Sequence, residues 1–231
     1  GVTARVAKLK QFEAEFAKLP GDSGRDLVLS NIRAALLELE TVRNWERNPD
    51  IYASGISSSA FTIMSRTFAP PEVRLRSLIS RELKMPQVLA AARVNLKNPP
   101  KIYTEIAIEQ LPGIVSFFQK DVPLAFKNVT DAKLLADFSA SNGAVIKALQ
   151  DYEKYLKADV LPRSNGDFRL GAENYAKKLL YEEMVDIPLD RLLRIGYDDL
   201  RANQKKFRET AALIDKNKTP QQVLAEFEKD H

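Results

Sequence analysis

Few residues of this chain could do chemistry, because histidine and cysteine are nearly absent from it. The 231-residue sequence has no cysteine, and its one histidine, His231, is the last residue. Histidine is the usual general base and the commonest metal ligand, and the cysteine thiolate is a strong nucleophile. We therefore expect no Ser-His-Asp triad, Cys-His pair or ordinary zinc site within the chain itself. The sequence predicts no catalytic residue, no metal ligand and no cofactor of its own.

One short segment, Gly21-Asp22-Ser23-Gly24, has the letters of the nucleophile motif of chymotrypsin-like serine proteases. A triad is recognised by its partners, and no internal histidine is available to activate Ser23. The flanking residues also have a helical pattern. We interpret the segment as a turn followed by a helix start, in which Ser23 and Asp26 match the capping-box pattern.

Paired carboxylates and clustered cations are more numerous, but they fit solvated helix faces. Neighbouring acids such as Asp198 and Asp199 point in different directions on a helix, so they do not converge as an acid–base pair; the same holds for Glu182 and Glu183, with Asp186. The densest basic cluster is Lys205, Lys206 and Arg208, with Arg201 upstream.

The charge of the whole chain is balanced rather than strongly basic. The sequence has 35 basic and 31 acidic residues, which are interleaved and give a net charge of +4. Nucleic-acid-binding domains concentrate their cations in a patch or stripe, so we predict no nucleic-acid partner. No apolar run approaches the roughly 20 residues of a transmembrane helix, so we also predict no membrane-spanning segment.

The elements that would position any site are helices from end to end. Apolar residues recur every three or four positions, as at Val2, Val6 and Leu9, and prolines stand at several helix starts. We expect an all-α fold of nine or ten amphipathic helices, packed as an irregular antiparallel array without significant sheet. The helices vary in length and show no fixed repeat, which argues against a tetratricopeptide-like array.

Four local features add detail to this prediction. Pro112-Gly113 lies within an apolar stretch and predicts a kink or break. The residues from Ile114 to Phe126 should be the most deeply buried. Residues 161–167 read as a loop, and 168–170 as a short extended piece. Residues 1–231 are expected to form a single helical region, with a possible subdivision near 128–131.

The segment 54–60 is rich in small residues, among them Ser54, Gly55 and Ser58. Small side chains allow another helix to approach closely, and they can also form the wall of a ligand site. Close helix packing is the more usual reason. The weaker functional alternative makes Ser58 a candidate substrate contact, together with Tyr103 and Glu105 near the start of a later helix.

Several segments in order resemble one large bacterial family, domain of unknown function 885. They are NPDIY (48–52), FAPPEVRLRSL (68–78), LAAARVNL (89–96), NPPKIYTEIAIEQL (98–111) and FRLGAENY (168–175). The resemblance covers nearly the whole chain. It implies an all-helical, zincin-like protein, predicted to be a zinc-dependent peptidase and often exported or lipid-anchored.

The same resemblance implies that complete members are more than twice this length and carry their zinc ligands in the C-terminal half. This sequence lacks that His-Glu segment, so no ligand role transfers to any residue here. We therefore expect a non-catalytic N-terminal region that forms one wall or lid of a peptide-binding cleft, with its own C-terminal half as partner. The resemblance favours an exported, periplasmic or lipoprotein-like location, with the cytoplasm as the alternative.

A second hypothesis from a different class remains open. The chain would then be a self-contained helical module that binds a protein or small ligand between helices. Such a module should cover its apolar surface, whereas half of a larger protein should expose an apolar patch where the other half docks.

Overall fold

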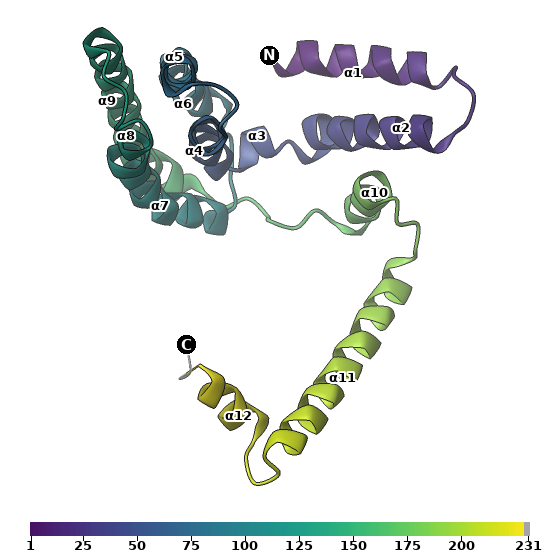
Figure 1. Ribbon diagram of the computed structural model, residues 1–231. Helices are drawn as coiled ribbons and strands as arrows, with labels where there is room; N and C mark the ends of the chain where they lie inside the picture. Colours follow the sequence, from purple (N-terminus) through teal and green to yellow (C-terminus); the bar gives the residue numbers. More distant parts are fainter. Residues whose placement is uncertain (229–231) are drawn as a thin grey trace. The chain divides into compact units, whose positions relative to one another are not determined.

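The computed structural model describes residues 1–228, and this part of the chain is helical with no strand (Figure 1). The all-α prediction is therefore confirmed; His231 lies outside the described residues. In chain order the helices are α1 (Val2–Phe16), α2 (Ser23–Leu36), α3 (Asn44–Arg47), α4 (Asp50–Ser65), α5 (Pro71–Glu82), α6 (Met85–Asn95), α7 (Lys101–Ser116), α8 (Val122–Ala125), α9 (Ala132–Tyr155), α10 (Ala172–Glu183), α11 (Leu189–Ile214) and α12 (Pro220–Phe227). Short π-helical segments interrupt or extend them: η1 (Leu37–Val42), η2 (Phe117–Asp121) and η3 (Leu156–Val160). A 3-10 helix, η4 (Leu161–Arg163), follows η3.

The chain divides into two compact units. The first unit comprises Gly1–Glu15 and Ala35–Leu170, and the second comprises Phe16–Ala34 and the residues from Gly171 onward. Residues 128–131, where the sequence suggested a subdivision, lie inside the first unit. Val129 is buried in its core there.

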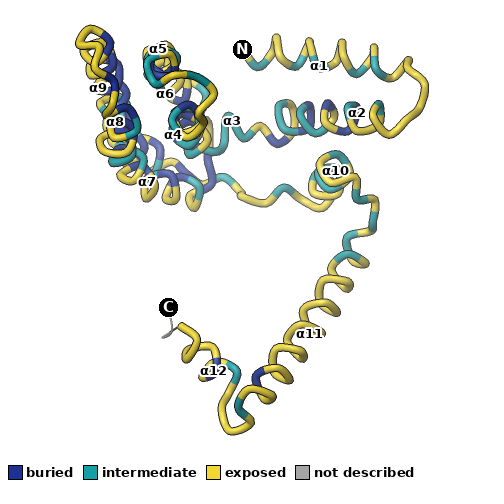
Figure 2. Tube along the Cα trace, viewed as in Figure 1, coloured by how far each residue is buried: buried dark blue, intermediate teal, exposed yellow. Residues whose placement is uncertain are grey.

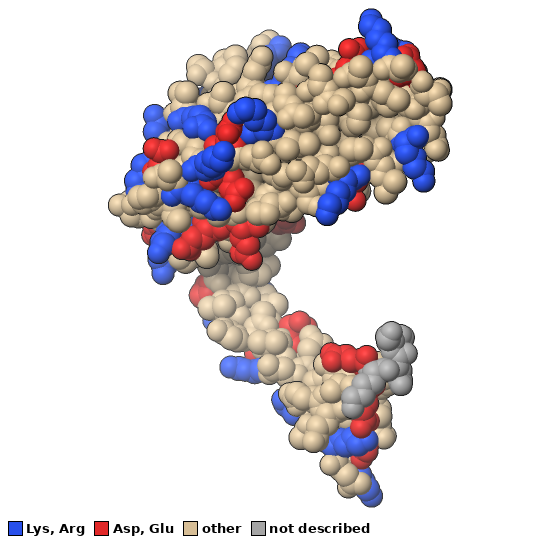
Figure 3. All heavy atoms as spheres, turned by 90° about the vertical axis from the view of Figure 1, so that its left-hand side faces the viewer, with Lys and Arg blue, Asp and Glu red and all other residues tan. Residues whose placement is uncertain are grey.

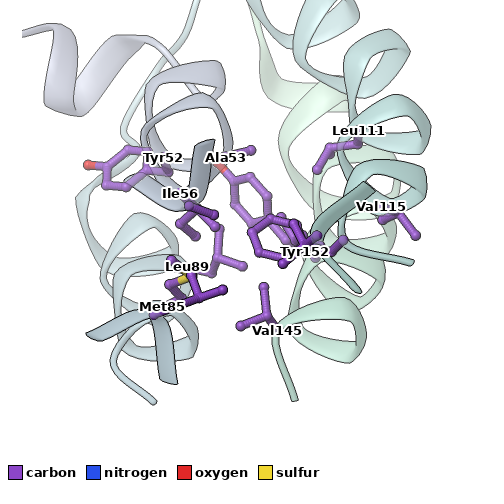
Figure 4. Packing of buried hydrophobic residues seen from close by; sticks show 14 of the residues in the cluster. Tyr52, Ala53, Ile56, Met85, Leu89, Leu111, Val115, Val145 and Tyr152 are labelled. Carbon is purple, nitrogen blue, oxygen red and sulfur yellow. The ribbon is translucent and has the colours of Figure 1, made fainter. Parts of the chain in front are cut away.

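The core of the first unit forms around α9, which packs against α5, α6 and α7, while α4 packs against α5, α6 and α7 (Figure 1). Leu111, Leu149 and Tyr152 are fully enclosed in this core. The Tyr152 ring lies at its centre in Figure 4, and its hydroxyl donates a hydrogen bond to the Pro49 carbonyl at 2.9 Å. Burying each such side chain contributes about 1.5–3 kcal/mol, so this helix cluster carries most of the unit's stability.

Prolines begin several of these helices, as the sequence predicts. Pro71 is the first residue of α5, and Pro86 lies in the first turn of α6. Pro100 immediately precedes α7. The pyrrolidine ring fixes φ near the helical value, and the N–H that proline lacks has no intrahelical partner in the first turn.

Arg74 of α5 joins the end of α4 to the core. Its buried guanidinium donates to the carbonyls of Met64 at 3.0 Å, Ala69 at 3.2 Å, and Ile63 and Arg66 at 3.3 Å. Carbonyls at a helix C-terminus lack intrahelical donors and carry the negative end of the helix dipole. One cation therefore satisfies several groups that burial would otherwise leave unpaired.

The expected capping role of Ser23 was wrong, and no break occurs at Pro112. The cap of α2 is Asp22, whose carboxylate accepts from the Arg25 N–H at 2.7 Å, while Ser23 is already helical. Helix α7 runs through Pro112 without a break, and the hydrogen-bonding register changes at η2, one turn later. Residues 168–170 form no strand.

The prediction of deep burial from Ile114 to Phe126 is confirmed at Phe118, Val122 and Phe126, which are almost completely enclosed. It fails at Leu124, which is largely exposed. Leu124 lies in the short helix α8, whose single turn places its side chain on the outer face while Val122 points inward.

The second unit contains most of α2 together with α10, α11 and α12. The Ser30 hydroxyl of α2 donates to the Tyr181 carbonyl of α10 at 2.8 Å. Thr219 and Gln222 form a capping box at the start of α12. Helix α11 has 26 residues, of which Ala211 is buried.

Candidate functional site

Ser58 is exposed and lines a groove between α4 and α7. The groove has a volume of about 380 Å³, and we call it the Ser58 groove; it is lined by Ser57, Ser58, Phe61, Thr62, Gly113, Ile114 and Phe117. Neither Tyr103 nor Glu105 is among these residues. The structure therefore does not bring the three predicted contacts into one site.

Tyr103 and Glu105 lie near the start of α7, where Tyr103 bonds to a distant segment and Glu105 pairs within the helix. The Tyr103 hydroxyl donates to the Phe168 carbonyl at 3.4 Å, which ties α7 to the segment that follows η4. Glu105 is exposed and pairs with Lys101 one turn earlier, at 3.6 Å. Their roles as substrate contacts stay predictions.

A second groove lies on the other side of α4, between this helix, α5 and α6. It has a volume of about 450 Å³, and we call it the Arg81 groove; its lining is Ile51, Tyr52, Gly55, Ile56, Ser59, Arg81, Lys84, Met85 and Val88. Figure 4 shows Tyr52, Ile56 and Met85 on neighbouring helices at the edge of the core. Sequence reasoning missed this groove, although the four-residue spacing of Gly55 and Ser59 places two small residues on one helix face.

The small-residue segment of α4 contributes both to helix packing and to the lining of two grooves. Ala53, Ile56 and Ala60 are buried against neighbouring helices. Gly55 and Ser59 line the Arg81 groove, and Ser57 and Ser58 line the Ser58 groove. Small side chains leave space beside the helix, so a groove lies on each of two sides of α4.

Glu82 is a buried carboxyl group in the core beside the Arg81 groove. The Ser141 hydroxyl of α9 donates to its Oε2 at 2.5 Å, and Oε1 has no hydrogen-bond partner among the described residues. Burial raises its pKa to about 7, and the Ser141 hydrogen bond opposes that rise. Near neutral pH this acid is divided between its neutral and charged forms.

The acidic pairs and the basic cluster in the second unit lie on solvated faces. Asp198 pairs with Arg201 at 3.8 Å, and Lys205 pairs with Glu209 at 3.7 Å. Asp199 accepts from Asn203 at 3.0 Å. Figure 3 shows Lys and Arg interspersed with Asp and Glu on the face that it presents. The absence of a nucleic-acid partner stays a prediction.

Residues 1–228 contain no group of three or more His, Cys, Asp or Glu side chains placed to hold a metal ion. Within the same range, no helix combines the length and the apolar character that crossing a bilayer requires.

Helix α11 of the second unit carries a long, exposed apolar face. Leu193, Leu200, Phe207 and Ile214 recur every seven residues and are 46–61% exposed. Figure 2 shows that most of α11 is exposed. Side chains at this spacing share one face of a helix, which is the pattern that packs against a second helix.

Comparison with solved structures finds a protein of similar fold from Shewanella oneidensis, described as a predicted lipoprotein of unknown function. The similarity has a TM-score of 0.73 and 24% sequence identity, and it covers 93% of this chain but 41% of that one. The chain thus spans less than half the length of the structure it matches. No protein of curated function matches the sequence.

The sequence profile of one family matches the chain over residues 1–231, and its description is a bacterial protein of unknown function, DUF885. The match extends over both compact units, and it includes the ordered segments that carry the resemblance. The chain belongs to the bacterial protein family of unknown function DUF885.

Proposed function

We propose that this chain is a non-catalytic helical region of a longer zinc-dependent peptidase, in which it forms one wall or lid of the substrate cleft. The observation that carries the proposal is the apolar face of α11. A helix with four large apolar side chains at seven-residue spacing, all about half exposed or more, is suited to dock on another part of a protein.

The proposed partner is the remainder of the longer polypeptide. The solved structure of similar fold is more than twice as long as the segment that this chain matches, which leaves ample chain to cover α11. The family resemblance is the basis for three parts of this proposal: the peptidase chemistry, the zinc ion and an exported, lipoprotein-like location. The Ser58 groove supplies a concave surface that such a wall could present to a peptide.

The test compares the full-length gene product with this chain, each with zinc and a peptide library. We expect zinc-dependent cleavage by the full-length protein and none by the isolated chain. The matched control is the full-length protein with the histidines of its C-terminal part changed to alanine, which should be folded and inactive. Cleavage by the isolated chain, or a gene that encodes nothing beyond it, contradicts the proposal.

A second candidate function is a self-contained helical module that binds a ligand between helices. The two grooves beside α4 favour it, because both lie in the volume range of small-molecule sites. Sedimentation analysis of the isolated chain separates the two functions. A self-contained module should be a well-behaved monomer or defined dimer, whereas a docking half with an uncovered α11 should associate further as concentration rises.

A further inference from the structure

The Arg81 groove combines apolar walls with two cations at its rim. Tyr52, Ile56 and Met85 are buried in the wall, while Ile51 and Val88 are partly exposed and extend it outward. The Tyr52 hydroxyl is already used, because it donates to the Trp45 carbonyl and accepts from the Asn95 amide at 3.1 Å. The wall therefore offers a ligand mainly carbon atoms.

No carboxylate among the described residues pairs with the two cations of this groove. Arg81 Nη1 donates to the Ser59 hydroxyl at 2.9 Å and more weakly to the Ser59 carbonyl at 3.4 Å, which holds the guanidinium between α5 and α4. Lys84 lies one turn further along the same rim. Among the described residues, neither cation pairs with a carboxylate, and none of the nine lining residues is acidic. Glu82, the acid next to Arg81, instead turns into the core and is bound by Ser141.

We propose that the Arg81 groove binds an unbranched aliphatic carboxylate, such as a medium-chain fatty acid. The carboxylate would lie at the rim, where the free N–H groups of Arg81 and the Lys84 ammonium complement its charge. The alkyl chain would lie along Ile51, Ile56, Met85 and Val88. A peptide fits this lining less well, because each buried amide needs hydrogen-bond partners that the wall does not supply. This inference does not depend on whether the longer protein is a peptidase.

The affinity should depend on chain length in a defined way. A groove of about 450 Å³ is within the range of small-molecule sites. Each methylene that leaves water for the apolar wall should tighten binding about fourfold until the groove is full. Calorimetric titration of the 231-residue chain with octanoate, decanoate and dodecanoate, each below its micelle concentration, measures this slope.

The headgroup and the groove are tested separately. Decanol has the same chain without the charge, so it should bind about tenfold more weakly than decanoate. Arg81→Gln and Lys84→Gln should each weaken decanoate about tenfold and leave decanol unchanged. Arg76→Gln removes one charge from the same helix, where Arg76 pairs with Asp131 instead, and should change neither ligand.

A blocking variant tests the location without unfolding the chain. A Cβ at Gly55 meets no atom within 4 Å, so Gly55→Leu should fill the groove while leucine favours the helix more than glycine does. It should abolish binding of both ligands. Gly113→Leu is the matched control, because Gly113 has the same free space but lines the Ser58 groove.

The proposal is overturned by any of four results. These are no saturable decanoate binding by the unmodified chain, equal affinity for decanol, unchanged binding in Gly55→Leu, or tighter binding of a leucine-terminated tripeptide than of decanoate. If Gly113→Leu lost binding and Gly55→Leu kept it, the ligand would bind in the Ser58 groove, and the proposal would also be overturned. The expected pattern of chain-length slope, headgroup dependence and selective block supports it.

Discussion

At the scale of single residues, Glu82 is a carboxyl group that is fully enclosed in an apolar core. A carboxyl group in an apolar core is disfavoured in its charged form, because water no longer solvates it. Glu82 has a single hydrogen-bond donor in Ser141, and burial raises its pKa to about 7. Its ordinary value of 4.5 applies to the unfolded chain. The folded state therefore holds a proton that the unfolded state releases between these two values.

This difference fixes the sign of a pH effect on stability. Because the folded pKa is the higher one, stability is fully present below about pH 4.5 and falls as the pH rises toward 7 and above. The loss is roughly 3 kcal/mol for a shift from 4.5 to about 7. Glu82→Gln keeps the shape and removes the titration, so urea unfolding should show the variant more stable than the parent at pH 8. Parallel pH profiles for the two proteins would show that Glu82 does not titrate this way.

At the scale of elements, the sequence placed helices well where proline or capping residues mark their starts. Pro71 and Thr219 act through local geometry, so a reader of the sequence can locate them. The end of α4 is different, because its carbonyls are satisfied by Arg74, several residues further on in the next helix. At Pro112 the sequence predicted a kink or break, and helix α7 continues through this residue without a break.

We therefore expect the stability of the first unit to be sensitive to substitution of the buried Arg74. Arg74→Met keeps the apolar stem but leaves the carbonyls of Ile63, Met64 and Arg66 without a donor, at a cost of about 2–4 kcal/mol in unfolding free energy. Arg74→Lys keeps the charge but loses the forked set of guanidinium donors. Its unfolding free energy should therefore lie between those of the parent protein and Arg74→Met. Arg76→Met, an exposed arginine on the same helix, is the control and should change stability by less than about 0.5 kcal/mol. Equal effects of the Arg74 and Arg76 variants would contradict the capping role.

At the scale of the whole molecule, the two units differ in how completely they bury their apolar residues. The first unit has a continuous core around α9, whereas α11 in the second unit has one buried residue among 26. A periodic apolar face was visible in the sequence, but the sequence does not say whether something covers it. The uncovered apolar face of α11 is the surface on which we propose that the rest of the longer polypeptide docks.

Lysine substitutions on α11 test that docking. Leu200→Lys and Phe207→Lys should change the unfolding free energy of the isolated chain by less than about 0.5 kcal/mol, because both side chains are about half exposed. In the full-length protein each should cost more than about 2 kcal/mol, since a charge would be buried at the docked face. Leu213→Lys is the control, because Leu213 is 88% exposed and outside the seven-residue series. Urea unfolding that shows Phe207→Lys to be neutral in both proteins rules the α11 face out as the docking surface.

The sequence alone determined the structural features that depend on residues close together in the chain. Helical periodicity, proline at helix starts and the Thr219 cap act within one or two turns, so the all-α class and most helix positions follow from them. The lack of internal histidine and cysteine likewise narrows the chemistry open to this chain without any coordinates.

Only the tertiary structure shows the grooves and buried groups that depend on residues far apart in the chain. Ser58 lines a groove together with residues of α7, Tyr103 bonds to the distant Phe168 carbonyl, and Glu105 pairs with Lys101 in its own helix. The spacing of these residues in the sequence could not distinguish the three outcomes. The Arg81 groove exists because α4, α5 and α6 pack with glycine and serine between them, and Glu82 is buried because α9 covers it. Packing is a property of surfaces brought together by folding, so it decides which polar groups are enclosed and which small residues leave space for a ligand.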